Sequence, residues 1–278
     1  MPRAFPRVES SKTSDVPARP ADAGAFVPPP RAKICGITNL EDAELAVELG
    51  AWALGMIFYE GSPRRCSLAE AQRIAALLRR EVRLCGVFVN ASLEGVVRTS
   101  EELGLTMLQL HGDEGPSFCA EAARRTGARV IKAAQVSGPG DVRDIERFHV
   151  DFHLLDARAG RSPDGGPDGR GSRGGTGETF DWTLLAARRS TIPLILSGGL
   201  NAENVTEAIA LTSPYAVDTA SGTERAPGHK DPGRLRAFFD AAVPMGHVPG
   251  RRQPAGPSTI RTTASDPAVS PVFPGPRG

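Results

Sequence analysis

Cys35 and Asp156 are the two residues of this sequence whose types could perform acid–base chemistry together. Cys35 ends a short apolar run that begins at Ala32, and Asp156 follows the apolar run 152–155. A thiol can accept a proton if a neighbouring cation lowers its pKa, and a carboxyl group can donate one if partial desolvation raises its pKa. The same positions would also suit a buried core thiol, and a helix cap or an ion-pair partner of Arg158. The spacing alone leaves both interpretations open.

Other polar side chains also stand at the ends of apolar runs. Lys33 lies two residues before Cys35, so a strand would turn both side chains to one side, where the ammonium would favour the thiolate. Gln109 and His111 end another run, and Lys132 a third. A histidine in such a place is either a base or, more often, a hydrogen-bonding or ligand-binding group. We expect Lys33, Gln109 and His111 to contact a ligand.

Two turns of small residues could hold an anion, and one arginine could hold a carboxylate. The turns contain Gly198 and Gly199 after one apolar run, and Ser221 and Gly222 after the next. Glycine lets backbone amides approach an anion, and a helix N-terminus favours negative charge. Simple tight turns are the alternative. The guanidinium fork of Arg64 fits a planar carboxylate, although such loop arginines are usually solvated.

The apolar runs alternate with amphipathic segments along the chain. We expect strands at residues 32–35, 53–58, 83–89, 107–110, 129–133, 152–155, 193–196 and 215–217. We expect helices at residues 39–49, 67–79, 92–102, 115–125, 141–148, 181–188, 201–211 and 231–242. Asn39 is a predicted N-cap, and Ser67 with Glu70 forms a predicted capping box.

Eight strand–helix units with strands that are apolar on both faces predict an α/β fold, a single (β/α)8 TIM barrel. The alternative is an open doubly wound sheet, but residues 35–39 do not form its dinucleotide-binding turn. In a barrel, the chemistry lies where strands end, and the loops after strands seven and eight commonly bind phosphate. The candidate residues would then meet at one mouth.

The composition limits the class of protein and its domain organisation. The 33 basic and 32 acidic residues give a net charge of +1, which argues against a nucleic-acid or membrane-surface partner. Residues 1–30 and 243–278 are rich in Pro and Ser or Gly, and we expect them to be disordered tails around a catalytic barrel of residues 31–242. No apolar run approaches the ~18 residues of a membrane span. The four cysteines lack CxxC spacing, which disfavours a metal site and fits a reducing, cytoplasmic location.

Motifs along the whole predicted barrel resemble those of the phosphoribosylanthranilate isomerase family. They are Lys33-Ile-Cys-Gly-Ile-Thr-Asn39, Gly55-Met-Ile-Phe-Tyr59, Ser62-Pro-Arg64, Gly86-Val-Phe-Val-Asn90, Leu108-Gln-Leu-His-Gly112, Leu154-Leu-Asp156, Gly174-Gly-Thr-Gly177, Phe180-Asp-Trp182, Leu196-Ser-Gly-Gly-Leu-Asn201, Glu203-Asn-Val205, Ala216-Val-Asp218 and Ser221-Gly222. Each motif is modest by itself, and their order makes the set specific.

The resemblance implies an Amadori rearrangement in tryptophan biosynthesis. The substrate would be N-(5-phospho-β-D-ribosyl)anthranilate and the product 1-(2-carboxyphenylamino)-1-deoxy-D-ribulose 5-phosphate. Asp156 would be the general acid, Cys35 the general base and Arg64 the carboxylate ligand. The residues expected to bind phosphate are Gly198, Gly199, Ser221 and Gly222. No metal or organic cofactor is implied, and the only implied partners are this phosphorylated small molecule and, in a homodimer, a second copy; a monomer is equally compatible.

Two departures and two alternatives accompany the resemblance. Arg65 and Cys66 replace an aromatic and an aliphatic residue, and the segment 158–173 is longer than usual and is predicted to be a mobile lid. The histidine-pathway aldose–ketose isomerase has the same fold, but it resembles a doubled phosphate-binding barrel with an aspartate in place of Cys35. A non-catalytic phosphate-binding barrel would lack the acid or the base, and both are present here.

Overall fold

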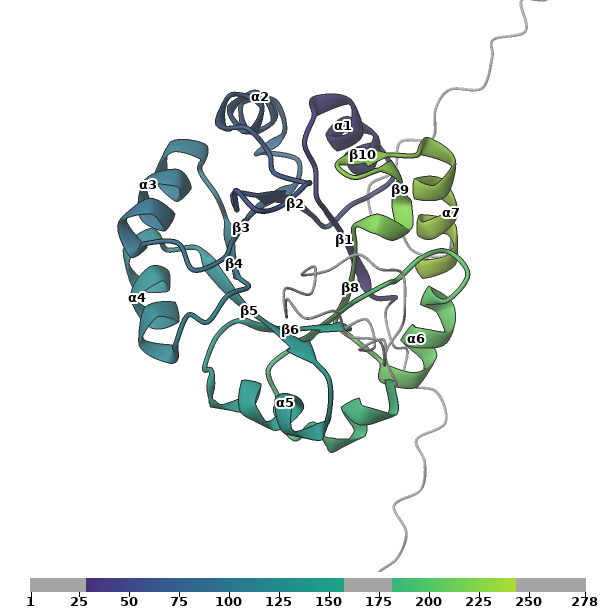
Figure 1. The fold of residues 1–278 in the computed structure, drawn as a ribbon. Coiled ribbons are helices and arrows are strands. Elements are labelled where there is room, and N and C mark those ends of the chain that lie inside the picture. The colour runs from purple at the N-terminus through teal and green to yellow at the C-terminus, as the bar shows by residue number, and fades with distance from the viewer. Residues whose placement is uncertain (1–28, 158–181, 244–278) are drawn as a thin grey trace, which may run out of the picture. The chain divides into compact units, whose positions relative to one another are not determined.

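Eight parallel strands form a closed barrel and follow one another around it in sequence order (Figure 1). The computed structural model describes residues 29–157 and 182–243. The strands are β1 Arg31–Cys35, β2 Ala53–Ile57, β3 Arg83–Phe88, β4 Met107–Leu110, β5 Arg129–Val136, β6 Phe152–Ala157, β7 Leu194–Ser197 and β8 Ala216–Thr219. The barrel closes where β8 pairs with β1, with Asp218 opposite Lys33. The predicted (β/α)8 barrel is therefore confirmed, and the open sheet is excluded.

Helices surround the barrel (Figure 1). They are α1 Leu40–Glu48, α2 Leu68–Leu78, α3 Leu93–Leu103, α4 Pro116–Thr126, α5 Pro139–Asp144, α6 Val205–Thr212 and α7 Pro232–Ala242, with 3-10 helices η1 Ile145–Arg147, η2 Trp182–Ala187 and η3 Ser221–Thr223. Three of the predicted helices differ from the structure. The fifth is divided into α5 and η1, the sixth is the 3-10 helix η2, and α6 begins at Val205 instead of residue 201. None of the α-helices and 3-10 helices in the described ranges is both long enough and apolar enough to cross a membrane.

Side-chain caps fix the starts of several helices. The Asn39 Oδ1 accepts a hydrogen bond from the Asp42 amide at 2.9 Å, which confirms the predicted N-cap. The Ser67 hydroxyl likewise accepts from the Glu70 amide at 3.2 Å. The predicted capping box is wrong in its second half, however, because the Glu70 carboxylate accepts from the Leu40 amide at 2.8 Å. That bond ties the start of α1 to α2 instead of closing a local ring.

The shift in the start of α6 also has a local cause. The side-chain oxygen of Asn201 accepts hydrogen bonds from the amides of Glu203 and Asn204, at 3.0 and 3.1 Å. Asx turns of this kind compete with helix formation, so the backbone stays in a turn until Val205.

Alternation along the strands divides the apolar residues into two packed layers. Inside the barrel, a cluster includes Cys35, Cys85 and Leu154; between barrel and helices, a larger one includes Ile34, Leu84 and Leu155. At the amino-terminal ends of the strands, Trp52, Phe152 and Tyr215 pack against each other with ring centroids 5.3–5.7 Å apart. These rings fill the barrel's floor, and the guanidinium groups of Arg31, Arg83 and Arg129 lie over them.

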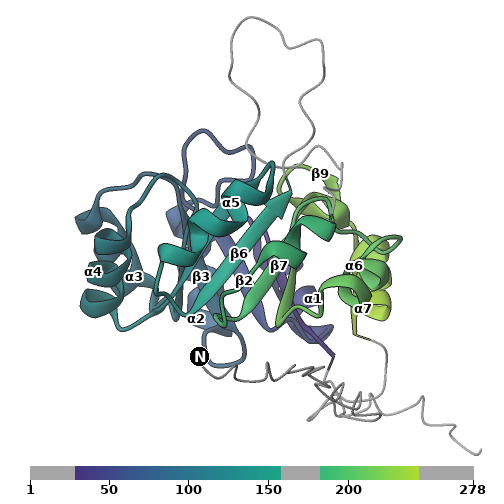
Figure 2. The same cartoon turned by 90° about the horizontal axis from the view of Figure 1, so that it is seen from below.

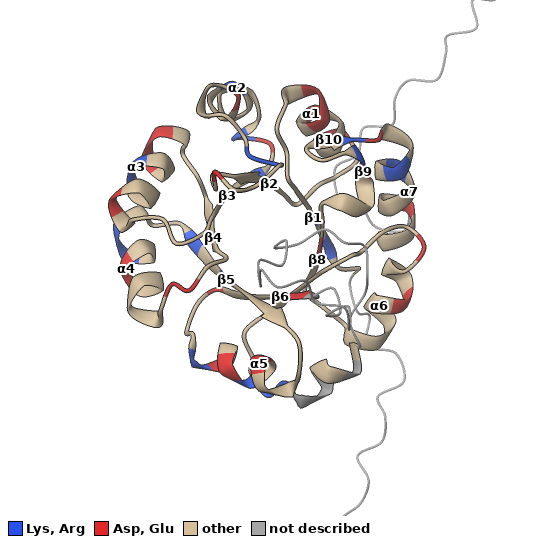
Figure 3. Ribbon diagram, in the orientation of Figure 1, with Lys and Arg blue, Asp and Glu red and all other residues tan. Residues whose placement is uncertain are grey.

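Charged side chains are distributed unevenly between the helices and the strands. Both signs are interspersed over the outer helices (Figure 3). The barrel strands, by contrast, bury four Lys or Asp side chains: Lys33, Lys132, Asp156 and Asp218. Burying an unpaired charge is unfavourable, so each of these needs a partner or a function. Three of them, Lys33, Asp156 and Asp218, belong to the site described below.

A two-stranded hairpin after β8 was not predicted from the sequence. Its strands are β9 Glu224–Ala226 and β10 His229–Lys230, joined by a turn in which Gly228 has φ 79°. Because the hairpin follows β8, it lies at the carboxyl-terminal end of the barrel, beside α1 and α7 (Figures 1 and 2).

The predicted tails and the predicted lid fall almost entirely outside the described residues. At the ends of the described barrel, Pro30 is buried and Val243 packs against the outer apolar cluster. The assignment of the remaining residues to disordered tails stays a prediction.

Candidate active site

The base candidate Cys35 lies above a buried ion pair at the mouth of the barrel. The Lys33 Nζ donates to the Asp218 Oδ1 at 2.7 Å, and the Ser197 Oγ donates to the Asp218 Oδ2 at 3.0 Å. Lys33 is fully buried, and Cys35 is 6% exposed. As predicted, Lys33 and Cys35 point to the same side of β1. The ion pair explains how the barrel tolerates an ammonium in its interior.

Gly55 supplies the space that these two side chains occupy. It lies opposite Cys35 on β2. A Cβ atom at Gly55 would lie 2.8 Å from the Cys35 Sγ and 3.1 Å from the Lys33 Nζ. Any other residue there would push the thiol or the ammonium away.

The pKa of the Cys35 thiol is higher than the sequence suggested. Burial raises the pKa of Cys35; the Lys33 ammonium opposes this increase, and the Asp218 carboxylate adds to it. Burial alone would lower the pKa of Lys33, but Asp218 raises it, so the lysine stays charged. Lys33 does favour the thiolate, as predicted, although its effect does not outweigh burial. The site therefore holds a thiol that needs assistance to lose its proton.

The acid candidate Asp156 lies at the end of β6, next to His111. Asp156 is 7% exposed, and its Oδ2 is 3.5 Å from the His111 Nε2. The Gln109 Nε2 lies 3.1 Å from the His111 Nδ1. An amide nitrogen only donates, so Nδ1 accepts and Nε2 carries the ring N–H that faces Asp156. The three candidates thus form one connected group.

Gln109 has one further atom available. Its Oε1 is buried and has no hydrogen-bond partner among the described residues. A buried polar atom without a partner is unfavourable, so it is a candidate contact for a bound ligand.

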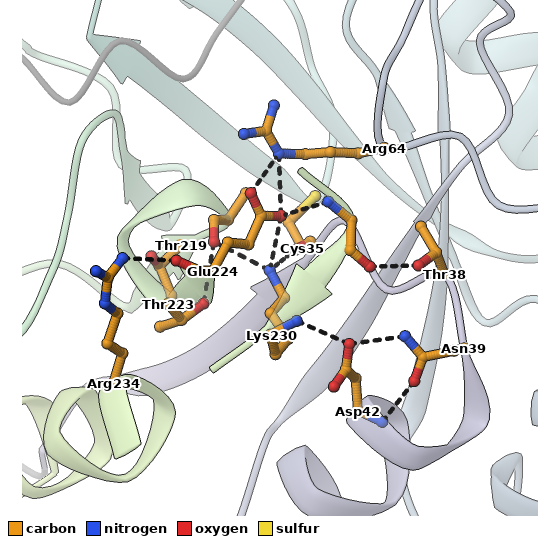
Figure 4. A network of polar contacts seen from close by, with 12 residues as sticks. Cys35, Thr38, Asn39, Asp42, Arg64, Thr219, Thr223, Glu224, Lys230 and Arg234 are labelled. Atoms are coloured by element: carbon orange, nitrogen blue, oxygen red, sulfur yellow. Dashed lines mark hydrogen bonds and ion pairs between the residues drawn. The ribbon is translucent and has the colours of Figure 1, made fainter. Parts of the chain in front are cut away.

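Arg64 is held by an acidic residue that the sequence analysis did not identify. Its Nε donates to both carboxylate oxygens of Glu224, at 3.0 and 2.9 Å. The Glu224 Oε1 also accepts from the Lys230 Nζ at 3.2 Å, and both side chains are buried (Figure 4). Arg64 is therefore not a freely solvated arginine, which was the alternative that the sequence left open.

The turns after β7 and β8 pack backbone against backbone. Gly198 and Gly199 have φ of 98° and 62°, a region that side chains strongly disfavour. A Cβ at Gly222 would overlap the carbonyl oxygen of Leu200. Glycine is thus required where the two turns meet. The turn after β7 therefore meets the turn after β8 at Leu200 and Gly222, the latter within η3.

The structure brings the predicted residues to one mouth and adds three to them. The additions are Asp218, Glu224 and Lys230. Asp218 could have been found from its place at the end of a strand, two residues before the predicted phosphate turn. Glu224 and Lys230 had no such pattern, because they belong to the unpredicted hairpin.

Lys132, another polar residue that the sequence placed at a strand end, makes structural contacts outside this group. Its Nζ donates to the Gly112 carbonyl at 2.7 Å and to the Glu114 Oε2 at 3.1 Å. Glu114 also accepts from the Asn90 amide at 2.7 Å. This cluster joins the loops after β3 and β4 to strand β5. In the described part of the chain, no group of three or more His, Cys, Asp or Glu residues could hold a metal ion.

A closed parallel barrel with a thiol, a carboxyl group, a guanidinium and two glycine turns at one mouth defines the class of acid–base enzymes that act on phosphorylated small molecules. The family model described as N-(5'phosphoribosyl)anthranilate (PRA) isomerase matches residues 32–241. The chain belongs to this family. It is an isomerase, and the family's reaction, the isomerisation of N-(5'-phosphoribosyl)anthranilate in tryptophan biosynthesis, is its activity. The resemblance seen in the sequence is confirmed.

Individual relatives agree with the family model. An N-(5'-phosphoribosyl)anthranilate isomerase from Citrifermentans bemidjiense is 45% identical over 212 residues, which cover 76% of this chain and 96% of the relative. The crystal structure of phosphoribosyl anthranilate isomerase from Thermotoga maritima has a TM-score of 0.65 and 39% identity, covering 77% of this chain and 98% of that one. Another crystal structure of the isomerase contains reduced 1-(o-carboxyphenylamino)-1-deoxyribulose 5-phosphate; it has a TM-score of 0.63 and 38% identity, with 77% and 98% covered. These matches favour the predicted family over the histidine-pathway isomerase.

Proposed function

We propose that Asp156 and Cys35 are the general acid and the general base of this isomerisation. Asp156 gives its proton to the ring oxygen of the ribose, the bond from that oxygen to C1 breaks, and the anthranilate nitrogen forms a protonated imine with C1. The Cys35 thiolate then takes the proton from C2, and the electron pair flows toward the imine nitrogen. The resulting enolamine tautomerises to the ketone. Each proton transfer of this kind is worth roughly 10²–10⁴-fold in rate.

The order of strands around the barrel is the observation that carries this proposal. Asp156 lies at the carboxyl end of β6, and Cys35 is the last residue of β1. On one side of the barrel, the strands between β6 and β1 are β7 and β8. The two glycine turns that follow β7 and β8 therefore lie between the acid and the base. A substrate whose phosphate occupies these turns would extend its ribose between the two side chains. Fixed positioning of this kind contributes to the rate independently of the proton transfers.

The binding roles follow from the same arrangement. Gly198, Gly199, Ser221 and Gly222 would bind the phosphate through backbone amides, and Arg64 would bind the anthranilate carboxylate. His111 and Gln109 would orient Asp156 and contact the substrate. Lys33 would stabilise the thiolate that forms when Cys35 loses its proton, offsetting the effect of burial.

Single substitutions test the acid and the base. Cys35→Ser and Asp156→Asn should each lower kcat by more than about a hundredfold. Binding of reduced 1-(o-carboxyphenylamino)-1-deoxyribulose 5-phosphate should stay within a few-fold, because neither change removes a ligand of the phosphate or carboxylate. Consumption of the fluorescent anthranilate-linked substrate measures the rate.

A matched control removes a thiol away from the mouth. Cys119 is a buried residue of α4, and Cys119→Ala should leave kcat close to that of the parent. Turnover within a few-fold of the parent in Cys35→Ser would remove the thiol from the mechanism. The same result in Asp156→Asn would remove the carboxyl group.

We also propose the compartment, the partner and the assembly state of the protein. All four cysteines are free and buried, which supports a reducing compartment such as the cytoplasm. The partner is the phosphorylated small-molecule substrate, with no nucleic acid, membrane or cofactor involved. The assembly is a monomer or a homodimer. Size measurement by light scattering distinguishes these two states.

A further inference from the structure

The hairpin β9–β10 places two buried ions beside the site, and the proposed chemistry uses neither of them. Glu224 is 4% exposed and Lys230 is fully buried. Burying a charge is unfavourable unless its partners compensate, so the pair requires an explanation from its contacts.

Lys230 connects three parts of the mouth. Its Nζ donates to the Cys35 carbonyl at 2.7 Å, to the Ala220 carbonyl at 3.0 Å and to the Glu224 Oε1 at 3.2 Å (Figure 4). The first acceptor belongs to the residue that carries the thiol, and the second begins the turn expected to bind phosphate. All three N–H groups of the ammonium therefore have acceptors, and none is left for a ligand.

Glu224, held by Lys230, in turn holds the side chain of Arg64. Its two carboxylate oxygens lie 3.0 and 2.9 Å from the Arg64 Nε. The two terminal nitrogens of the guanidinium point away from Glu224 (Figure 4). An arginine held by Nε alone keeps both of these nitrogens available, in one plane, for a second carboxylate.

The hairpin itself is tied to the loop after β1 and to the first turn of α1. The Thr38 hydroxyl donates to the Gly228 carbonyl, and the Lys230 amide donates to the Asp42 carboxylate at 2.8 Å. The Gly228 amide also points to the Glu224 Oε1, at 3.3 Å. Glu224 is thus fixed by backbone and side-chain contacts, in addition to its contact with Arg64.

We propose that Glu224, anchored by Lys230, is a positioning residue that holds the Arg64 guanidinium in the orientation that recognises the carboxylate of the substrate's aromatic ring. This inference rests on the proposed carboxylate role of Arg64 and deepens it. Burial lowers the pKa of Lys230, but Glu224 and the two carbonyl acceptors favour its charged form. With Lys230 charged, Arg64, Glu224 and Lys230 sum to one positive charge, which a single substrate carboxylate balances. The hairpin is therefore part of the specificity for an anthranilate-type ligand.

A purely structural role for Glu224 makes a different prediction. If Glu224 only stabilised the hairpin, its loss would weaken every ligand of the mouth alike. If it acts through Arg64, its loss would weaken only ligands that carry the carboxylate. Two ligands that differ in this group therefore separate the two roles.

The experiment measures the affinities of two analogues by calorimetry. One is reduced 1-(o-carboxyphenylamino)-1-deoxyribulose 5-phosphate, and the other is the same compound without the carboxyl group. In Glu224→Gln, we expect the preference for the carboxylated analogue to fall roughly tenfold, with the other affinity nearly unchanged. The KM for N-(5'-phosphoribosyl)anthranilate should rise similarly, with a much smaller change in kcat.

Two further variants accompany this experiment, one as a control and one as a replacement for Glu224→Gln. Glu60→Gln removes an exposed carboxylate 3.7 Å from the neighbouring Arg65 and should leave the preference unchanged. Glu224→Asp keeps the charge but shortens its reach, and provides the same test should Glu224→Gln fail to fold. Equal loss of affinity for both analogues, or an unchanged preference, in the folded variant would overturn the inference.

Arg64→Ala shows whether the underlying proposal holds. It should abolish the preference, and adding Glu224→Gln to it should then have no further effect on the preference. An unchanged preference in Arg64→Ala would overturn the carboxylate role of Arg64 itself. A lost preference there, combined with an unchanged one in Glu224→Gln, would overturn only the positioning role.

Discussion

At the scale of single residues, the mouth is organised around ions that neutralise one another. Lys33 stays charged because Asp218 accepts from it at 2.7 Å, and its charge in turn acts on Cys35. Burial raises the pKa of the thiol, so any group that favours the thiolate has a direct effect on the fraction of active base. Lys33 is the stronger of two ammonium groups that do so, and Lys230 is the other.

Lys33→Met should therefore shift the pH–rate profile to the alkaline side. The base works when deprotonated, so kcat/KM rises as the pH passes through the pKa of Cys35. Removing the Lys33 ammonium removes the largest influence that lowers this pKa; burial and Asp218, which raise it, remain and are opposed by Lys230. The ascending limb of the kcat/KM profile should therefore move to higher pH.

A cation at the other end of the same strand provides the control. Arg31 lies over the ring of Tyr215, at 4.3 Å from its centroid, at the floor of the barrel. Arg31→Met should leave the ascending limb where it is. An unshifted limb in folded Lys33→Met, or a shift to lower pH, would show that Lys33 does not act on the thiol.

The contacts that the sequence did not identify all join residues that are far apart along the chain. Lys33 and Asp218 are 185 positions apart, Arg64 and Glu224 are 160, and Cys35 and Lys230 are 195. Residue type and local spacing can indicate that a side chain ends a strand. They cannot indicate which distant side chain faces it, because that depends on how the barrel closes.

At the scale of elements, strands were predicted better than their connections. The predicted and observed ends of β1 to β4 differ by one residue at most, because buried strands form short, uninterrupted apolar runs. The hairpin was missed because its strands have three and two residues and consist largely of charged side chains. The start of α6 was misplaced because the turn at Asn201 resembles a helix N-terminus in sequence.

The meeting of the two glycine turns provides a prediction at this scale. A Cβ in Gly222→Ala would overlap the Leu200 carbonyl oxygen, so one turn must move away from the other. If these turns bind the phosphate, KM should rise at least about tenfold, since misplaced amides lose charge-assisted hydrogen bonds. Inorganic phosphate should also become a weaker competitive inhibitor, which steady-state kinetics would measure.

Gly140→Ala is the corresponding control, because a Cβ at Gly140 in α5 would meet no atom within 4 Å. It should change neither KM nor phosphate inhibition. If Gly222→Ala binds both ligands as the parent does, the phosphate lies elsewhere in the mouth.

At the scale of the whole molecule, the family match and the described barrel have almost the same limits. The match spans residues 32–241, and the relative from Citrifermentans bemidjiense aligns over 96% of its own length with 76% of this chain. The family's fold and every residue of the proposed site therefore fall within the predicted domain of residues 31–242. The expected division into tails and barrel came from composition and from the lack of periodicity, because Pro-, Gly- and Ser-rich segments contain few residues that can form a core, and it stays a prediction.

The isolated fragment of residues 31–242 should consequently retain the isomerase activity of the full chain. We expect kcat/KM within about twofold, a difference of about 0.4 kcal/mol in transition-state stabilisation. A fragment of residues 29–243 is the matched comparison: it restores the buried Pro30 and the contact of Val243 with the outer core, and should melt at a higher temperature than the shorter one. Thermal unfolding and steady-state kinetics on all three proteins check both expectations. Loss of more than tenfold in kcat/KM from both folded fragments would place a contribution to catalysis in the terminal segments, which contain none of the residues proposed here to act on the substrate.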